Sequence, residues 1–483
     1  MKHILPISLL FILLLASCSS LSGTATPEAS LTLEDCVLTS PSGYQVDARC
    51  GALTVPEDRS NPGGRQIDLH VAVIPAINRD PEPDPLFLLA GGPGQSAIET
   101  FPAMLPLMFQ VHQERDIVLV DQRGTGKSNP LRCIDPEDES LDNDEVLELL
   151  KDCPDTLDAD LRFYTTEIAM TDLNEVRSAL GYEAINIYGA SYGTRTALTY
   201  LRIFPEHVRT VTLDAVVDPQ FVIFMDAAED GQASLDTFFA RCEADDACKT
   251  TFPNLRSEFE EMLTRVEESP KDITIPHPLT NKPLELTVTR ELITNMIFNT
   301  LYVPDLVATL PLSIHTAYAD ENYVPLISQA FLVNAGLYDG MFYAVTCTED
   351  APLISPAEAA EEGASSIFGD RTVDFSAVCA EWPKGAVSPQ FRDPVRSDVP
   401  MLILSGEADP ITPPRHAEKI AESLGNELHI TFPGMGHGNL STRCTSNIFK
   451  DFIESASING LDISCTEKIQ PPPFFVDFSG PRP

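Results

Sequence analysis

The sequence has few basic residues for its length. Its 483 residues include 32 Lys and Arg against 72 Asp and Glu, which gives a formal net charge of −40. A surface with this charge repels phosphate backbones, so we expect no nucleic-acid partner. The charge itself indicates a well-solvated surface and identifies no substrate. Because 43% of the residues are hydrophobic and 22% are charged, the chain can bury a large core, which excludes wholesale disorder.

The sequence also lacks the common motifs for metals and cofactors. It contains no HExxH, no P-loop and no dinucleotide-binding fingerprint, and its His and Cys residues form no cluster. No two cysteines have the CxxC spacing of a redox motif or a zinc ribbon. We therefore expect neither a metal ion nor an organic cofactor.

The apolar run at residues 4–15 is too short to cross a bilayer as a mature helix, and it follows the basic residue Lys2. Its length and position are those of the hydrophobic part of a signal peptide. The run ends in the letters LASC, which resemble a bacterial lipobox, in which the cysteine, here Cys18, is lipidated and becomes the first mature residue. An ordinary signal peptide with an incidental cysteine is the alternative. We predict that residues 1–17 are removed and that residues 18–34 form a flexible tether.

Lipidation at Cys18 predicts where the mature protein works. It would lie outside the cytoplasm, and its partner at the N-terminus would be a bacterial membrane, reached through the lipid. If Gram-negative sorting applies, Ser19 after the lipidated cysteine favours the outer membrane, facing the periplasm.

Ten cysteines remain when Cys18 is set aside from the total of 11. An even number in an exported chain favours disulfides. Ten cysteines allow roughly 900 pairings, so the sequence cannot fix the connectivity. Proximity along the chain suggests Cys36–Cys50, Cys133–Cys153, Cys242–Cys248, Cys347–Cys379 and Cys444–Cys465.

Short runs of Val, Ile and Leu alternate with helical patterns up to about residue 218. Continuous hydrophobic strands that alternate with helices indicate a parallel sheet covered on both faces. The same alternation resumes near residue 396, whereas the residues between are mostly helical, with prolines at the joints. The strand-like runs lie at residues 67–74, 86–89, 117–120, 185–188, 208–213, 401–404 and 428–432.

This alternation predicts an α/β fold with a mostly parallel central sheet and helices on both faces. Residues 35–218 would form the first part of the core and residues 396–483 its C-terminal part. Residues 219–395 would form an inserted, mainly helical lid, because the sheet must close around a block inserted between its halves.

The strongest chemical motif is the GxSxG sequence at residues 189–193, in which Ser191 is the central serine. It follows a strand-like run and precedes a helical pattern, which is the context of a nucleophile elbow. A serine at such a turn exposes its hydroxyl above the sheet, and the helix N-terminus adds amide donors and a favourable dipole. Ser191 is therefore the predicted nucleophile.

A serine nucleophile needs a base and an orienting acid, in the chain order Ser, Asp or Glu, His. Asp409 follows the strand-like run at residues 401–404, and His437 lies in a glycine-rich loop after the next run. Both positions lie beyond the carboxyl ends of parallel strands, where ligands bind in open α/β sheets. We predict a Ser191, Asp409 and His437 triad. Asp214 and Asp218 are alternative acids, and Glu407 is less favoured.

The loop at residues 90–94 opens directly from a strand-like run and reads AGGPG. Glycines bring backbone amides close to a reacting carbonyl, as an oxyanion hole requires. The predicted donors are the amides of Gly92 and Tyr192, with Gly91 as the alternative to Gly92.

Taken together, these residues resemble the α/β-hydrolase serine peptidases of the prolyl aminopeptidase and tripeptidyl aminopeptidase family, and the resemblance spans about residues 50–465. One departure is Ala90, where the family usually has a His that shapes the oxyanion loop. The markers are AGGPG at 90–94, DQRGTGKS at 121–128, GASYG at 189–193 and FPE at 204–206, with YTT at 164–166, CTE at 347–349 and CAEWP at 379–383 for the tripeptidyl branch.

The resemblance implies an α/β-hydrolase fold and an aminopeptidase that releases one to three residues from free peptide N-termini. His437 would take the Ser191 proton during attack on a carbonyl, and water would release the acyl-enzyme. Lid carboxylates hold the substrate's amine in such enzymes, and Glu349 is the best-matching position.

Two other functions remain open at this point. A carboxylesterase acting on small esters would use the same triad, because acyl transfer does not distinguish amides from esters. A non-catalytic binding lipoprotein could keep the fold without the chemistry.

Overall fold

The computed structural model describes residues 31–134, 143–276, 281–330 and 336–481. The signal peptide predicted for residues 1–17, the lipidation site Cys18 and most of the tether predicted for residues 18–34 lie outside these ranges. Within them, no helix combines the length and the apolar character that a bilayer crossing requires.

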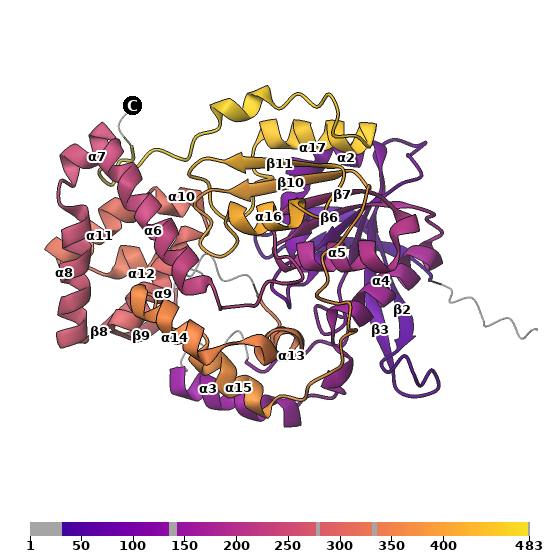
Figure 1. The fold of residues 1–483 in the computed structure, drawn as a ribbon, viewed down its shortest axis with the longest axis horizontal. Coiled ribbons are helices and arrows are strands. Elements are labelled where there is room, and N and C mark those ends of the chain that lie inside the picture. Colours follow the sequence, from indigo (N-terminus) through magenta and orange to yellow (C-terminus); the bar gives the residue numbers. More distant parts are fainter. Residues whose placement is uncertain (1–30, 135–142, 277–280, 331–335, 482–483) are drawn as a thin grey trace, which may run out of the picture.

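A nine-stranded sheet forms the centre of the fold (Figure 1), in the order β1-β2-β3-β5-β4-β6-β7-β10-β11. The pairs from β5 to β11 are parallel, whereas the β1–β2, β2–β3 and β3–β5 pairs at one edge are antiparallel. The predicted α/β fold with a mostly parallel sheet is therefore confirmed. The strands are β1 (Glu34–Thr39), β2 (Gln45–Pro56), β3 (Gln66–Ile74), β4 (Leu86–Leu89), β5 (Ile117–Val120), β6 (Ile185–Ala190), β7 (Val208–Asp214), β10 (Met401–Gly406) and β11 (Glu427–Phe432).

The central strands β4, β5 and β10 are hydrophobic runs whose every residue is buried. Helices cover both faces of the sheet, which explains why these strands show no polar alternation. Helices α4, α5 and α16 pack on one face and helices α2 and α17 on the other, each against its own hydrophobic cluster (Figure 1). Their bounds are α1 (Ala97–Thr100), α2 (Phe109–Glu114), α4 (Thr166–Leu180), α5 (Tyr192–Ile203), α16 (Pro414–Ala421) and α17 (Arg443–Ser455).

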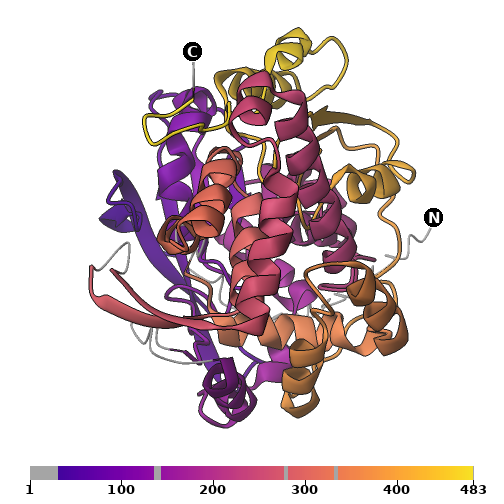
Figure 2. The same cartoon turned by 90° about the vertical axis from the view of Figure 1, so that its left-hand side faces the viewer.

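The chain between β7 and β10 forms a largely helical unit with its own hydrophobic core, which lies over one end of the sheet (Figures 1 and 2). Strands β7 and β10 pair directly, so this insertion leaves and re-enters the sheet between neighbouring strands. Its helices are α6 (Ala227–Ala244), α7 (Asp246–Thr251), α8 (Leu255–Glu268), α9 (Arg290–Leu301), α10 (Pro304–Val307), α11 (Leu310–Ala319), α12 (Val324–Ala330), α13 (Asp339–Glu349), α14 (Pro356–Ser365) and α15 (Val373–Glu381). Helix α3 (Asn143–Asp152), from the first part of the core, packs against α15.

The insertion also contains an antiparallel hairpin that the sequence analysis did not predict. Strands β8 (Lys271–Pro276) and β9 (Pro283–Val288) pair along six residues each. Both strands are short, and each has a proline at an end and several exposed positions. Their hydrophobic signal is therefore too weak to stand out among helical neighbours.

All five suggested disulfides are present, and they confirm the pairing by proximity. The Cα atoms of each pair lie 5.0–5.9 Å apart. The Cys347–Cys379 bond joins α13 to α15 within the insertion, and Cys36–Cys50 joins the two outermost antiparallel strands. Each bond closes a loop of the unfolded chain, which lowers the entropy gained on unfolding.

A buried ion pair ties the sheet to helix α4. Arg123, which follows β5 and is 0% exposed, donates to both carboxylate oxygens of Asp172 on α4, at 2.6 and 2.9 Å. Its remaining nitrogen donates to the carbonyls of Glu57 and Phe163, each at 2.8 Å. Arg59 pairs with Asp172 from the other side. The guanidinium charge is thus neutralised and its donors are used, as a buried arginine requires.

Replacing Asp172 with Asn should destabilise the fold by about 3–5 kcal/mol, because it leaves the buried Arg123 charge uncompensated. Urea unfolding followed by far-UV circular dichroism measures the effect. The control is Asp451→Asn, which breaks an exposed 3.1 Å pair with Lys450 and should cost under about 1 kcal/mol. Equal losses in the two variants would contradict a structural role for the buried pair.

Candidate active site

Ser191 lies at the tight turn between β6 and α5. Its backbone has φ 55° and ψ −125°, a conformation that L-residues rarely adopt, and its amide donates to the Asp214 carbonyl at 2.9 Å. The two glycines of the motif permit this turn. A Cβ on Gly193 would lie 2.1 Å from the Leu89 carbonyl oxygen, and a Cβ on Gly189 would lie 2.2 Å from that of Gly193. The sequence GxSxG is therefore a packing requirement of the turn as well as a chemical signature.

His437 and Asp409 meet beyond the carboxyl ends of β11 and β10. The Nδ1 atom of His437 lies 2.8 Å from an Asp409 carboxylate oxygen, and the Asp409 side chain is fully buried. Asp409 also accepts hydrogen bonds from the amides of Ile411 and Thr412 and from the Thr412 hydroxyl. With Nδ1 held by the carboxylate, Nε2 is the nitrogen that remains available as a base.

The insertion fixes the other side of His437. Tyr302, at the end of α9, accepts a hydrogen bond from the His437 amide at 2.9 Å. Its ring also packs edge-on against the imidazole, with 5.1 Å between ring centroids. The ring of the base is thus held between the acid from the core and an aromatic side chain from the insertion.

The alternative acids have structural roles. Asp214 is fully buried and accepts hydrogen bonds from the Tyr188 hydroxyl and from the amides of Asn439 and Leu440. It thereby holds the loop after His437 against the sheet. Asp218 accepts from backbone amides of its own turn, and Glu407 accepts from the Gly434 amide. Asp409 is therefore the acid that the structure brings to His437.

The electrostatics of the pair favour the charged state of each partner. Burial opposes the imidazolium, but the Asp409 carboxylate, with a smaller contribution from Asp214, raises the pKa of His437 above its usual value. Burial likewise opposes the Asp409 charge, yet His437 and the amides of the Asp409 loop together lower the pKa of Asp409. Asp409 therefore favours the ionised form and orients the imidazole of His437.

Two backbone amides are free to bind an oxyanion beside Ser191. The Gly91 amide donates to the Gln95 side chain at 3.0 Å, so the alternative donor is already occupied. Among the described residues, the amides of Gly92 and Tyr192 have no acceptor. Gly92 has φ 106°, where any side chain would strain the backbone, and a Cβ there would lie 2.7 Å from the Gly94 nitrogen.

Asp121 of the DQRG motif holds the residues that follow the glycine–proline loop. The Asp121 carboxylate accepts hydrogen bonds from the Ser96 hydroxyl at 2.6 Å and from the Ile98 amide at 3.1 Å. Ser96 is the N-cap of α1, the helix that begins directly after the glycine–proline loop. Asp121 therefore fixes the distance between the end of β5 and the loop that carries Gly92.

A cavity of about 140 Å³ opens at Ser191, Tyr192 and Gly92. Most of its walls are apolar and come from the insertion or the segment that leads into it, whereas a few polar groups line the rest. The apolar side chains are Pro93, Val217, Phe221, Ile223, Phe224, Phe342 and Ile411, and the polar ones are Arg195, Tyr302, Asp350 and Thr412. Apolar walls with few polar groups are typical of a substrate pocket.

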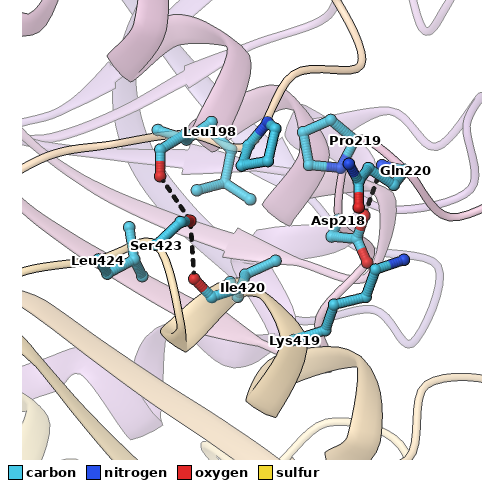
Figure 3. Close-up of a pocket in the computed structure, with 10 residues that line it drawn as sticks. Leu198, Asp218, Pro219, Gln220, Lys419, Ile420, Ser423 and Leu424 are labelled. Carbon is cyan, nitrogen blue, oxygen red and sulfur yellow. Dashed lines mark hydrogen bonds between the residues drawn. The ribbon is translucent and has the colours of Figure 1, made fainter.

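A second, smaller cavity of about 30 Å³ has no residue in common with the first (Figure 3). It lies between α5, the Asp218 turn and α16, with Leu198, Gln220, Lys419 and Ser423 around it. Its volume is that of one or two water molecules, so it is a packing defect rather than a substrate site.

The structure does not support the predicted amine-binding role of Glu349. Its side chain is 0% exposed, and it does not line the cavity at Ser191. Both carboxylate oxygens accept hydrogen bonds from Thr166, one from the amide at 2.7 Å and one from the hydroxyl at 2.9 Å. A carboxylate with both oxygens occupied behind the pocket wall cannot reach a substrate amine. Asp350, the next residue, lines the cavity instead, but it pairs with Arg195 and Arg392.

Comparison with known proteins agrees with this geometry. Residues 84–265 match the family model described as the alpha/beta hydrolase fold. The chain has the α/β-hydrolase fold. Residues 365–465 match the model described as TAP-like protein, which confirms the resemblance to the tripeptidyl aminopeptidase branch.

Three curated proteins are among its relatives. A tripeptidyl aminopeptidase of Streptomyces lividans is 30% identical over 222 residues, which are 42% of this chain and only 41% of that protein. Serine protease Hip1 of Mycobacterium tuberculosis is 25% identical over 429 residues, 81% of each chain. Carboxylesterase B of M. tuberculosis is 29% identical over 434 residues, 81% of this chain and 80% of that one.

A fluorophosphonate probe should label Ser191, and Ser191→Ala should abolish the labelling. Because only neutral His437 accepts the serine proton, the labelling rate should fall as the pH drops through the raised pKa of His437. Asp409→Asn removes the main charge that raises this pKa. The midpoint should therefore move to lower pH, and the rate should fall by about 10³–10⁴-fold because the imidazole loses its orienting partner.

The measurement is the labelling rate from pH 5 to 8, read by gel fluorescence or intact mass. Glu407→Gln, at a carboxylate of the same loop that accepts a hydrogen bond from the Gly434 amide, is the control and should keep the wild-type midpoint. An unchanged midpoint in Asp409→Asn would rule out Asp409 as the partner of the base.

Proposed function

We propose that this protein is a serine aminopeptidase that removes one to three residues from peptides with a free N-terminus. The proposal depends on the side chains and amides that meet beyond the carboxyl ends of the central parallel strands. A serine on a strained strand-to-helix turn faces a mostly apolar cavity, next to a buried His437–Asp409 pair and two unused amides. The similarity to a tripeptidyl aminopeptidase and to serine protease Hip1 supports peptides as the substrate class.

In this mechanism, Nε2 of His437 takes the proton of the Ser191 hydroxyl while its oxygen attacks the peptide carbonyl carbon. The carbonyl oxygen gains negative charge and accepts hydrogen bonds from the Gly92 and Tyr192 amides. Collapse of the tetrahedral intermediate breaks the C–N bond, and the imidazolium gives its proton to the leaving amine. His437 then takes a proton from a water molecule, whose oxygen attacks the acyl carbon; the bond to the Ser191 oxygen breaks, and the imidazolium returns its proton to that oxygen.

The cavity walls indicate which acyl groups fit. Phe221, Ile223, Phe224 and Phe342 offer apolar surface close to the nucleophile, so hydrophobic side chains in the released fragment should be favoured. These walls belong to the insertion and its approach, so the lid would select the substrate while the core performs the chemistry.

Carboxylesterase activity is the second candidate. The relative named carboxylesterase B covers four fifths of this chain at 29% identity, and the same triad cleaves esters. A non-catalytic binding protein is the least favoured alternative, because the nucleophile, the base, the acid and both oxyanion amides all remain.

A paired substrate panel separates these functions. Purified protein lacking residues 1–18 is assayed on free and N-blocked mono-, di- and tripeptide anilides and on short-chain aryl esters, with Ser191→Ala as the blank. An aminopeptidase should cleave the free-amine anilides with at least about 10-fold preference over blocked ones. The number of residues in the free-amine anilide that is cleaved fastest gives the number of residues released. Ester turnover without anilide cleavage would instead establish the esterase. If neither substrate class is cleaved, both hydrolase functions are excluded.

We also propose that the mature protein is anchored outside the cytoplasm by a lipid on Cys18, as the LASC sequence suggests. Cys18→Ser should move the protein from the membrane pellet to the soluble fraction, and it should remove the diacylglyceryl mass from the N-terminal peptide. A variant of the tether, Ser20→Ala, is the control and should stay with the membrane. Membrane retention of Cys18→Ser would contradict the anchor.

A further inference from the structure

A chain of hydrogen bonds links the insertion to the oxyanion-binding turn. Glu349, the last residue of α13, accepts from the Thr166 amide and hydroxyl at 2.7 and 2.9 Å. The Thr166 hydroxyl also lies 2.7 Å from the hydroxyl of Tyr192. Tyr192 is the first residue of α5, and its amide is one of the two unused donors beside Ser191. All three side chains are buried, so these hydrogen bonds are shielded from bulk water.

The direction of this chain depends on the charge of Glu349. When Glu349 is ionised, the Thr166 hydroxyl donates to it, and the Tyr192 hydroxyl donates to Thr166, so every proton has an acceptor. When Glu349 is protonated, it donates to the Thr166 oxygen, and the Thr166 proton turns toward Tyr192. The Tyr192 proton then has no acceptor among the described residues, which costs about 1–3 kcal/mol for a buried donor.

The groups around Glu349 have opposing effects on its pKa, so neither the ionised nor the protonated carboxyl is strongly favoured near neutral pH. Burial raises the pKa of Glu349 to about 7, against the opposing effects of Arg195 and the Thr166 hydrogen bonds. Arg195 of α5 lies 3.7 Å from the carboxylate, but it is engaged more closely by Asp350 at 3.0 Å. Arg392, before β10, pairs with Asp350 and donates to the Glu349 carbonyl. Asp350 therefore takes most of the positive charge that would otherwise hold Glu349 ionised.

We propose that Glu349 is a positioning residue whose ionised carboxylate, through Thr166, holds Tyr192 in the geometry in which its amide binds the oxyanion. The proposal rests on the serine acyl-transfer function proposed above. Glu349 touches neither substrate nor nucleophile. Its protonation disorders the Tyr192 side chain and weakens acylation, so the acid limb of the enzyme depends on two groups, His437 and Glu349.

The test uses the rate of Ser191 labelling by a fluorophosphonate, which requires the same oxyanion site whether the natural substrate is a peptide or an ester. In the wild type, the logarithm of the rate should fall with a slope steeper than 1 over the pH range in which Glu349 titrates, because the full rate requires two deprotonated groups. In Glu349→Gln, the slope should fall to 1, and the rate at pH 8 should be roughly 10-fold lower. That loss is smaller than the roughly 10²–10³-fold loss expected when an oxyanion donor is removed outright.

A double-mutant cycle with Tyr192→Phe tests whether Glu349 changes the labelling rate through the Tyr192 hydroxyl. Tyr192→Phe removes the hydroxyl that ends the chain and keeps the backbone amide. It should reproduce the slope of 1, and adding Glu349→Gln to it should change the rate by less than 2-fold. Glu361→Gln, an exposed acid on α14, is the matched control and should keep the wild-type rate and slope.

Thermal unfolding gives a readout that does not need activity. A carboxyl whose pKa is about 7 when folded and about 4.3 when unfolded loses stability as the pH rises between these values. Glu349→Gln lacks this loss, so the Tm of the variant minus that of the wild type should increase between pH 4.5 and 7.5. His437 is present in both proteins, so its contribution cancels.

The outcomes separate the two proposals. No labelling of the wild type would overturn the serine hydrolase function itself. Labelling with wild-type rate and slope in Glu349→Gln, or additive effects in the double mutant, would overturn the positioning role alone. If Glu349→Gln has no cooperative unfolding transition, Thr166→Val takes its place, because it breaks the same chain and keeps the carboxylate. An unchanged slope in Thr166→Val would then overturn the role.

Discussion

The turn at Ser191 is the constraint on which the rest of the site depends. A serine with φ 55° can be held there only because Gly189 and Gly193 let β6, α5 and the end of β4 approach within contact distance. That packing exposes the serine hydroxyl and points the first amide of α5 at the same space. The strain is offset by the buried sheet around it, since the neighbouring strands are hydrophobic along both faces.

Three parts of the chain meet at the carboxyl ends of the parallel strands and form the site. The first part supplies Ser191 and the glycine loop, and the C-terminal part supplies Asp409 and His437. The insertion between them contributes Tyr302, which packs on the imidazole, and the aromatic walls of the cavity. The insertion has its own hydrophobic core, so it contributes these groups as a unit that packs separately from the sheet.

Buried charge is concentrated around the nucleophile helix. Asp350 pairs with both Arg195 and Arg392 at the cavity wall, and Glu349 lies farther from Arg195 than Asp350 does, at 3.7 Å against 3.0 Å. A carboxylate that is costly to ionise there contributes little to stability. Its contacts with Thr166 instead connect a helix of the insertion to Tyr192, the proposed oxyanion donor. The insertion and the core are thereby linked by polar contacts as well as by apolar packing.

The sequence by itself predicted the alternating fold and placed Ser191, Asp409 and His437 in the chain order of a triad. These features follow from local signals, namely strand-like runs, the GxSxG turn and the loops that end each strand. Disulfide pairing by proximity also held, because each partner lies on a nearby segment. The sequence favoured Asp409 over Asp214, and only the tertiary structure showed that Asp409 is the carboxylate in contact with His437, whereas Asp214 binds the amides of the following loop. The tertiary structure also showed that Glu349 binds Thr166 instead of lining the pocket, and these two residues are 183 positions apart in the sequence. Side-chain direction across such a distance depends on how α13 packs on α4, and no local pattern encodes that packing.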